Sequence, residues 1–323
     1  MPTTAKEMNM TEQAPREVEH EITVSAPAPE VYRLLAEVEN WPRIFPPSVY
    51  VDYVEKNGDE ERIRIWATAN GEAKNWTSRR RLDPAGLRIT FGQEVSAPPV
   101  AEMSGTWIIE PQGAGCRLRL LHSYRAIDDD PAGLAWIDRA VDRNSRSELA
   151  ALKTNVELAA HSAELTLTFE DSVRINGSAK DAYDFVNEAQ LWTDRLPHVS
   201  RVSLTEDEPG VQTLRMDTVA KDGSTHTTES VRVCFPHHGI VYKQTTLPAL
   251  MTLHTGSWRF DEGSDGVTTA TSRHTVVINT ENIMRILGPD AGIPQARTFL
   301  REALGANSRA TLGHAKSYAE ARR

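Results

Sequence analysis

The sequence predicts an α+β protein made of two tandem copies of one domain, each a curved antiparallel β-sheet wrapped around a long C-terminal helix. Three observations predict this fold class. Landmark residues recur in the same order roughly 150 residues later. Each copy contains segments in which apolar and polar residues alternate, and each ends in a long stretch with apolar residues at helical spacing. A repeat of this length is far longer than a solenoid unit, so each copy corresponds to a domain.

The repeat is defined by matched positions along the whole 323-residue chain. Trp41 recurs as Trp192, at an offset of 151 residues. Further matched pairs are Tyr32/Tyr183, Pro46/Pro197, Ser78/Ser230, Arg80/Arg232, Gly105/Gly256, Trp107/Trp258, His122/His274 and Asn144/Asn307. The last pair has a larger offset, which indicates an insertion before the final helix of the second copy. We therefore expect a disordered N-terminal tail at 1–17, one domain at 18–161 and a second domain at 162–323.

The first copy indicates which elements each domain contains. Residues 20–26 alternate as a strand does, and Pro29 can occupy the first turn of a helix. Alternating segments follow between Val49 and His122, separated by turn sequences. Asp130-Pro131 is typical of a helix start, and helical spacing continues to about residue 161. Only this last helix is long enough to cover one face of the sheet, and a curved sheet leaves room for an internal cavity beneath it.

The composition excludes several classes of function. The chain has 36 Lys and Arg against 45 Asp and Glu, and the net charge of −9 argues against nucleic acid as a partner. No apolar run approaches the roughly 18 residues that cross a bilayer, so no membrane partner is expected. With only Cys116 and Cys234, neither a disulfide framework nor a thiolate metal site is expected. The polar first residues lack a signal sequence, which predicts a cytoplasmic protein.

Motifs in the first copy resemble those of one enzyme family. H-x-I-x-V-x-A-P-x-x-x-V-Y and W-P-R-I-F-P-P lie within 20–47, I-W-A-T-A-N-G at 65–71 and W-T-S-R-R at 76–80. These motifs are similar to those of the polyketide aromatase/cyclases, which have a START-like helix-grip fold of the SRPBCC superfamily and act beside bacterial type II polyketide synthases. The resemblance extends over residues 18–320, and the duplication resembles the didomain members of the family.

The resemblance implies a cyclase and dehydratase of aromatic polyketide biosynthesis. Such an enzyme would close the first ring, between C7 and C12, of a poly-β-ketone held on an acyl carrier protein and then remove water. The implied partners are that carrier protein and the ketosynthase and ketoreductase of the same synthase. No metal or redox cofactor is expected, because enolisation and dehydration are acid–base steps. A START-like protein that only binds a hydrophobic ligand or the polyketide chain is the alternative, and an intermediate case has one copy catalyse while the other holds the chain.

Trp76, Ser78 and Arg80 alternate along one expected strand and therefore face the same side of the sheet. The resemblance implies that this side lines the cavity, where Arg80 would hold a carbonyl or enolate oxygen and Ser78 would orient or relay a proton. Spacing alone favours the alternative that residues 79–81 form a solvated basic strip, and the resemblance reverses this for Arg80. His122 is expected to point inward, either as a core histidine or as a group that titrates near neutral pH.

In the long helix, Asn144 interrupts the apolar stripe. A buried polar residue needs a partner, which predicts either a polar cavity or a hydrogen bond from helix to sheet. Asn307 has the same place in the second copy.

The second copy keeps part of this pattern. Ser230 and Arg232 occupy the positions of Ser78 and Arg80, whereas Thr228 replaces Trp76. A candidate acid–base set for dehydration consists of Arg232, His254, His274 and Asn307. We expect the substrate to be contacted by Trp41, Phe45, Trp66, Trp76, Trp107, His122, Asn144, Trp192, Trp258 and Asn307. Four arginines of the second copy form either a solvated face or a docking site for an acidic carrier protein: Arg285, Arg297, Arg301 and Arg309.

Overall fold

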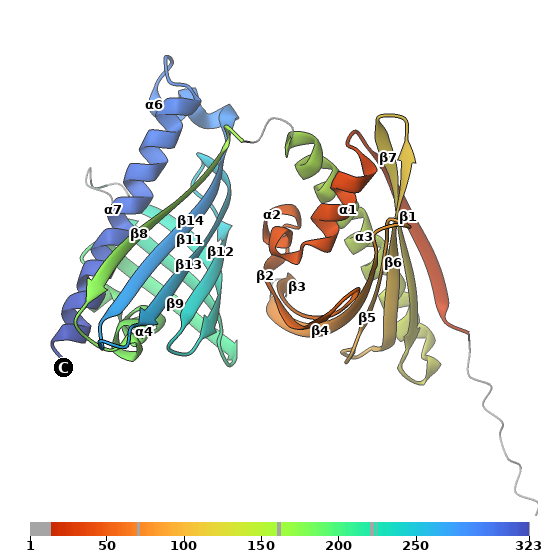
Figure 1. Ribbon diagram of the computed structural model, residues 1–323, viewed down its shortest axis with the longest axis horizontal. Coiled ribbons are helices and arrows are strands. Elements are labelled where there is room, and N and C mark those ends of the chain that lie inside the picture. The colour runs from red at the N-terminus through yellow and green to blue at the C-terminus, as the bar shows by residue number, and fades with distance from the viewer. Residues whose placement is uncertain (1–13, 70–71, 160–162, 220–222, 224, 323) are drawn as a thin grey trace, which may run out of the picture. The chain divides into compact units, whose positions relative to one another are not determined.

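The computed structural model describes residues 14–69, 72–159, 163–219, 223 and 225–322. These residues form two seven-stranded antiparallel sheets with helices packed on them, which confirms the predicted α+β fold class and the duplication (Figure 1). Most of the predicted tail, residues 1–13, lies outside the described residues. The first strand begins at Arg16, so residues 16 and 17 belong to the sheet.

The elements of the two copies follow the same order. The first copy consists of β1 (Arg16–Val24), α1 (Ala28–Ala36), η1 (Val38–Asn40), α2 (Trp41–Ile44), β2 (Ser48–Asn57), β3 (Glu60–Ala69), β4 (Glu72–Asp83), β5 (Arg88–Gln93), β6 (Val100–Gln112), β7 (Gly115–Ala126), η2 (Ile127–Asp129) and α3 (Pro131–Ala159). The second copy consists of β8 (Thr166–Ile175), α4 (Ala179–Asn187), η3 (Ala189–Leu191), α5 (Trp192–Arg195), β9 (Val199–Glu208), β10 (Val211–Val219), β11 (Thr225–Phe235), β12 (Gly239–Thr246), β13 (Met251–Glu262), β14 (Thr268–Ile278), η4 (Thr280–Asn282), α6 (Ile283–Leu287) and α7 (Ile293–Glu320). The segment with α6 is the insertion that the sequence predicts before the last helix.

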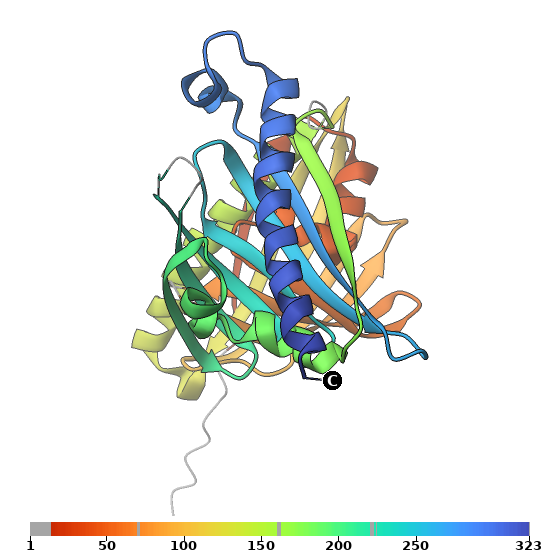
Figure 2. The same cartoon turned by 90° about the vertical axis from the view of Figure 1, so that its left-hand side faces the viewer.

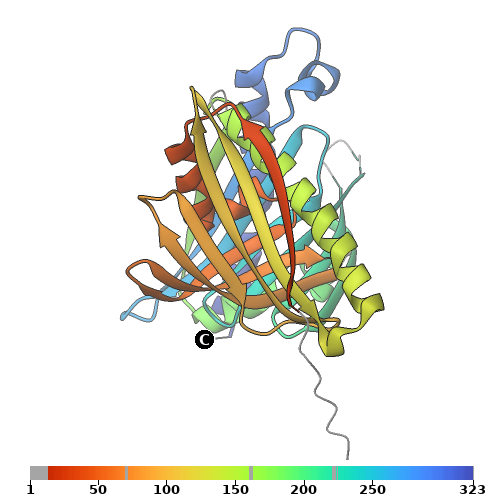
Figure 3. The same ribbon diagram turned by 90° about the vertical axis from the view of Figure 1, so that its right-hand side faces the viewer.

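In each sheet, strands that follow one another in the sequence pair as a meander, and the first strand of the copy pairs with its last strand at one edge. The orders are β1-β7-β6-β5-β4-β3-β2 and β8-β14-β13-β12-β11-β10-β9. Figure 3 shows β1 beside β7 at the edge of the first sheet. Figure 2 shows α7 running across the second sheet, where it packs on β8 and β14 and on α4. The long helix therefore covers one face of the sheet, as the lengths of the elements predict.

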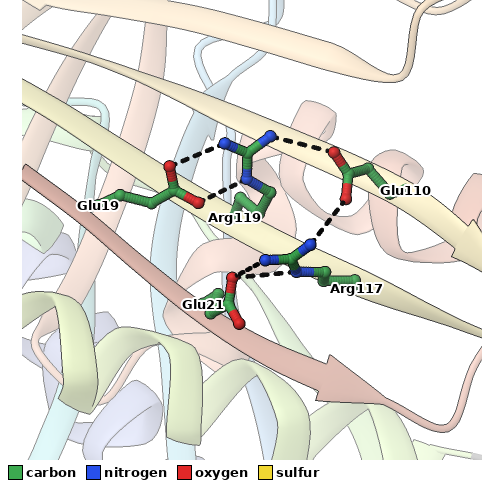
Figure 4. Close-up of polar contacts among 5 residues, drawn as sticks. All are labelled: Glu19, Glu21, Glu110, Arg117 and Arg119. Atoms are coloured by element: carbon green, nitrogen blue, oxygen red, sulfur yellow. Dashed lines mark hydrogen bonds and ion pairs between the residues drawn. The ribbon is translucent and has the colours of Figure 1, made fainter.

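Ion pairs mark the outer face of the first sheet, across β1, β7 and β6 (Figure 4). Arg119 on β7 pairs with Glu19 on β1 and with Glu110 on β6, and Arg117 pairs with Glu21 and Glu110. The hydrogen bond from Arg119 lowers the pKa of the Glu19 carboxyl. Strand residues alternate between the two faces of a sheet, so the residues of β1 and β7 that lie between these charged positions face the interior.

The chain divides into two compact units that differ from the two copies of the repeat. Residues 37–52, with parts of β3 and β4, cluster with the second copy in the larger unit. In that unit the Lys243 ammonium donates to the carbonyl oxygens of Pro42, Phe45, Pro46 and Ser48 at 2.7, 3.0, 2.8 and 3.0 Å. Burial lowers the pKa of Lys243 to about 7, although the four carbonyl oxygens favour its charged form.

No helix within the described part of the chain is long and apolar enough to cross a membrane.

Candidate active site

Arg80 lies on β4 and is bound by groups of its own chain. Its Nε donates to Glu61 on β3 at 3.1 Å, and its Nη2 also bonds that carboxylate. Nη1 donates to the Leu35 carbonyl at 3.1 Å and Nη2 to the Ala36 carbonyl at 2.6 Å, at the end of α1. Both members of the ion pair are buried. Arg80 is therefore an interior residue whose charge Glu61 balances, whereas its neighbour Arg79 is exposed.

Ser78 and Trp76 precede Arg80 on the same face of β4. Ser78 is 4% exposed and donates from Oγ to the Gly92 carbonyl on β5 at 2.9 Å, while Trp76 is half-buried. An open hollow of 290 Å³ lies beside these strands. Glu61, Arg80 and Phe91 border it, but most of its lining consists of exposed residues such as Glu60 and Arg81. The expected strand face is thus confirmed, because all three alternating positions of β4 point away from solvent to some degree.

His122 lies on β7 between an aromatic ring and a hydroxyl group. Its ring meets Phe91 edge to face with centroids 5.8 Å apart, and its Nδ1 is 3.5 Å from Ser145 Oγ on α3. Burial and the neighbouring His20 lower the pKa of His122 to about 4. The imidazole is therefore neutral at pH 7, and it stays neutral while relaying a proton when one ring nitrogen releases a proton as the other accepts one.

The predicted placement of the two helix asparagines is wrong. Asn144 on α3 and Asn307 on α7 are exposed, and the following serines, Ser145 and Ser308, are buried. The buried side of α3 runs through Ile137, Val141, Ser145 and Leu149. Successive helical residues are turned by about 100°, so a phase error of one position moves a side chain from the buried side to solvent.

Among the expected aromatic contacts, Trp66 requires a second correction. It is 6% exposed but lies on the face of β3 opposite to Ile63 and Ile65. Its ring packs against Tyr50 and Phe235, with centroids 5.5 and 5.9 Å away, in a hydrophobic cluster of the larger unit. The sequence predicted that Trp66 contacts the substrate, whereas this ring is buried because it packs on the other face of the sheet.

The other aromatic candidates are compatible with an interior role. Phe45 is buried and packs edge-on against the half-buried Trp41, with ring centroids 5.7 Å apart. Trp107 is buried on the face of β6 that carries Ile109. In the second copy Trp192 and Trp258 both belong to the main hydrophobic core.

Arg232 on β11 differs from Arg80 in its partners. It is 2% exposed, and its Nη2 donates to the Val186 carbonyl at 2.7 Å. Its guanidinium carbon lies 5.4 Å from the centre of the Trp192 ring, in a cation–π contact. Nη1 is buried without a hydrogen-bond partner, and Arg232 forms no ion pair with the described residues. Ser230, two residues earlier, is also buried.

The second copy brings two of the predicted histidines together. His254 Nε2 on β13 lies 2.9 Å from His274 Nδ1 on β14, and the two rings are stacked. The Tyr242 hydroxyl on β12 lies 3.2 Å from the same Nδ1, and Ser272 Oγ lies 3.1 Å from His274 Nε2. We call these four residues the histidine cluster. Asn307 is exposed and does not belong to it.

Burial keeps the histidine cluster uncharged. It lowers the pKa of His254 to about 3, with a further contribution from His274, and it lowers the pKa of His274 to about 4. Burial also raises the pKa of Tyr242 above its usual range. At pH 7 the cluster therefore consists of neutral imidazoles and a phenol, which can pass a proton along hydrogen bonds.

Tyr242 and Ser272 were not identified from the sequence. The glycine of the repeated Gly-x-Trp motif, however, indicates the position of the tyrosine. A Cβ atom on Gly256 would lie 2.4 Å from the Tyr242 ring and hydroxyl, and one on Gly105 would lie 2.4 Å from the Phe91 ring. The glycine of each Gly-x-Trp motif thus leaves room for an aromatic side chain on the neighbouring strand. Tyr242 stands 151 positions after Phe91, so the repeat offset itself identifies the pair.

The four arginines considered for docking all contact their own chain. Arg301 and Arg309 on α7 bind Asp171 on β8, with nitrogen–oxygen distances of 2.9 and 3.0 Å. Burial raises the pKa of Asp171, but the hydrogen bonds from both arginines outweigh it and hold the pKa below its usual value. Arg297 donates to two backbone carbonyls, and Arg285 donates to Asn282. These contacts show how the arginines are held by their own chain, and docking of an acidic carrier protein on them stays a prediction.

No group of three or more potential metal ligands was found within the described residues.

Comparison with protein families decides where the chain belongs. Residues 15–157 and 166–320 each match the family described as polyketide cyclase / dehydrase and lipid transport. The chain belongs to this family. The predicted family resemblance is therefore confirmed, and the protein is an enzyme of the polyketide cyclase/dehydratase class.

Relatives of this cyclase/dehydratase match it over nearly the whole length. The granaticin polyketide synthase bifunctional cyclase/dehydratase of Streptomyces virginiae is 52% identical over 298 residues, which cover 91% of this chain and 97% of that protein. The actinorhodin polyketide synthase bifunctional cyclase/dehydratase of Streptomyces coelicolor is 46% identical over 312 residues, covering 94% of this chain and 96% of the relative.

Two solved structures have the same two-domain architecture. The di-domain ARO/CYC BexL from the BE-7585A biosynthetic pathway is 70% identical, with a TM-score of 0.90, over 95% of this chain and 100% of that one. The di-domain ARO/CYC StfQ from the steffimycin biosynthetic pathway is 35% identical, with a TM-score of 0.85, over 94% and 99% of the two chains. The tandem START-like fold of the cyclase/dehydratase is thereby confirmed.

Proposed function

We propose that this cyclase/dehydratase directs closure of the first ring, between C7 and C12, of a poly-β-ketone held on an acyl carrier protein, and then removes water to leave an aromatic ring. The full-length similarity to bifunctional cyclase/dehydratases of polyketide synthases supports the reaction class. The regiochemistry and the carrier-bound substrate rest on the family resemblance of the motifs at residues 20–47 and 76–80.

The histidine cluster beside Arg232 is the observation that carries this proposal. Aldol closure needs a base for the carbon between two carbonyls and a donor for the oxygen that becomes negative. Dehydration needs a second proton removal and a proton for the departing hydroxide. Neutral His254 and His274, linked at 2.9 Å, can relay these protons when one ring nitrogen releases a proton as the other accepts one, and Arg232 Nη1 is a donor without a hydrogen-bond partner.

A buried position favours each of these steps. Bulk water would let the flexible chain react at other carbons and would weaken the hydrogen bonds that hold the negative oxygen. We assign the chemistry to Ser78, Arg80, Ser230, Arg232, His254 and His274. In this assignment Arg80, whose charge Glu61 balances, holds a neutral carbonyl oxygen, and Arg232 holds the oxygen that becomes negative. We assign substrate contacts to Trp41, Phe45, Trp76, Trp107, His122, Trp192 and Trp258.

The proposed partners are the acyl carrier protein that presents the chain and the ketosynthase and ketoreductase of the same synthase. Names of the relatives that refer to polyketide synthases support a role within such machinery. The proposed location is the cytoplasm, where thiols stay reduced, and the thiols of Cys116 and Cys234 are both free.

Reconstitution tests the proposed reaction. A minimal synthase and ketoreductase are combined with and without this protein, and the ring pattern of the products is compared. We expect the protein to channel products into one first-ring pattern, and Arg232→Ala to slow that channelling roughly a hundredfold, because one donor to a developing oxyanion is lost. Arg259→Ala, an exposed arginine of the same copy, is the matched control and should behave like wild type. The same ring pattern with and without the protein would refute the cyclase proposal.

A further inference from the structure

The two copies of the repeat differ at the residue that faces the buried arginine. Glu61 binds Arg80 in the first copy. The residue 151 positions later is Gln212 on β10, which is the register partner of Arg232 on β11. The duplication has therefore kept the arginine and replaced its carboxylate partner with a neutral amide of the same length.

This exchange leaves Arg232 without an ion pair among the described residues, although the charge of the Glu206 carboxylate still counteracts in part the lowering of the pKa of Arg232 by burial. Gln212 Nε2 donates to Glu206 Oε2 at 2.8 Å, so this carboxylate is hydrogen-bonded to the amide and not to the guanidinium. Arg232 Nη1 and Gln212 Oε1 are both buried without hydrogen-bond partners. The Val186 carbonyl and the Trp192 ring stabilise the guanidinium only in part. A buried charge without an ion pair is unfavourable in the protein interior, and a bound anion would relieve it.

The surroundings of Arg232 favour an organic anion. The Trp192 ring covers one side of the guanidinium, and Tyr242 is the register partner of Arg232 on the strand opposite to Gln212. Tyr242 in turn contacts His274 of the histidine cluster. A planar, delocalised enolate could thus accept from Nη1, lie among aromatic rings and remain next to neutral acid–base groups.

We propose that Gln212 is a specificity-determining residue: because it is neutral, Arg232 forms a binding subsite for the enolate anion of a 1,3-dicarbonyl compound, whereas Glu61 makes the arginine of the first copy unsuitable for an anion. The identity of the anion rests on the proposed function, since 1,3-dicarbonyl units make up a poly-β-ketone. Arg80 and Arg232 occupy matched positions in the repeat but differ in the charge of the ligand that they can bind.

Binding of 2,4-pentanedione to the full-length protein tests this inference without any synthase. Ultraviolet absorbance distinguishes the enolate of this diketone from its neutral forms, so a pH titration gives the pKa of the bound diketone. With wild-type protein we expect this pKa to fall by roughly one unit or more, because a cation close to an acid favours its anion. Gln212→Glu should abolish the shift, because it rebuilds the ion pair of the first copy.

Gln212→Met is the matched control, because it keeps the side-chain length and the neutral charge. We expect it to retain the shift. An unchanged shift in Gln212→Glu would overturn the inference, and so would loss of the shift in Gln212→Met, which would assign the effect to the amide. Thermal unfolding checks that each variant is folded. If Gln212→Glu does not fold, Arg232→Met serves instead, and a retained shift in that variant would also overturn the inference.

The binding titration and the reconstitution assay fail independently. The titration involves no turnover and no carrier protein. An absent shift in the pKa of the diketone, together with a ring pattern that depends on the protein, would overturn the anion subsite and leave the cyclase proposal in place. An unchanged ring pattern with an intact shift would instead refute the cyclase proposal and leave the anion subsite in place.

Discussion

Glu148 places a carboxyl group one turn beyond Ser145 on the inner side of α3. It is half-buried and makes neither a hydrogen bond nor an ion pair with the described residues. Burial raises its pKa to about 7, because the interior disfavours the carboxylate. Near neutral pH this group can exchange a proton, which makes it a candidate acid or base in the first copy that sequence reasoning did not single out.

The raised pKa of Glu148 predicts how stability changes with pH. Between pH 4.5 and 7 the folded protein binds more protons at this site than the unfolded chain, so its contribution to the free energy of unfolding falls as pH rises through that window. Glu148→Gln removes this dependence. We expect the variant to be more stable than wild type at pH 8 by roughly 2 kcal/mol and nearly equal at pH 4.

Urea unfolding at the two pH values measures the effect of Glu148→Gln. Glu302→Gln, on the exposed side of α7, is the control and should change stability little at either pH. A Glu148→Gln variant that is less stable than wild type at pH 8 would show that the carboxylate is stabilised and would contradict the prediction.

At the level of elements, the contact between β13 and β12 depends on a strand residue without a side chain. A Cβ atom on Gly256 would meet the Tyr242 ring at 2.4 Å and the Arg273 backbone oxygen at 2.6 Å. Because one of these atoms is backbone, a rotamer change alone does not relieve the overlap. We expect Gly256→Ala to lower the free energy of unfolding by roughly 1 to 3 kcal/mol and to move Tyr242 away from His274.

Thermal unfolding and ring-closure activity measured side by side check the effect of Gly256→Ala. Gly92→Ala on β5 is the matched control, because its nearest non-neighbouring atom would be 3.8 Å from the new Cβ, an ordinary contact. Equal melting temperatures for Gly256→Ala and wild type would show that the strands can separate without cost, contrary to the prediction.

At the level of the whole molecule, the larger compact unit includes residues from both copies of the repeat, and Lys243 bonds four carbonyls within it. Lys243→Met would remove the ammonium that donates to these four carbonyl oxygens while keeping an aliphatic chain of similar length. Because buried carbonyl oxygens would lose their partners, we expect the free energy of unfolding to fall by roughly 2 to 4 kcal/mol.

Denaturant unfolding of the full chain measures the effect of Lys243→Met. Lys180→Met is the control, because Lys180 is exposed and forms an ion pair with Asp184 within α4, which predicts a change below about 1 kcal/mol. Equal losses in the two lysine variants would show that the four carbonyl bonds contribute little.

The sequence by itself determined the duplication, the order of elements and the insertion before α7. These features depend on local periodicity and on the spacing of matched residues, which survive in the sequence whatever the strands pack against. Alternation also identified the strand faces of His254 and His274, although it did not determine that the two rings are in contact.

Only the tertiary structure decided which partners surround each buried charge. Glu61 and Gln212 face their arginines from neighbouring strands, and a sequence does not reveal the register of two strands. The sequence likewise did not reveal which side of α3 is buried, so Asn144 was misplaced. It also did not reveal that both faces of β3 are buried, so Trp66 was assigned to the wrong face. Charge balance in an interior arises from such cross-strand contacts, so the difference between the two arginines appeared only once the sheets were assembled.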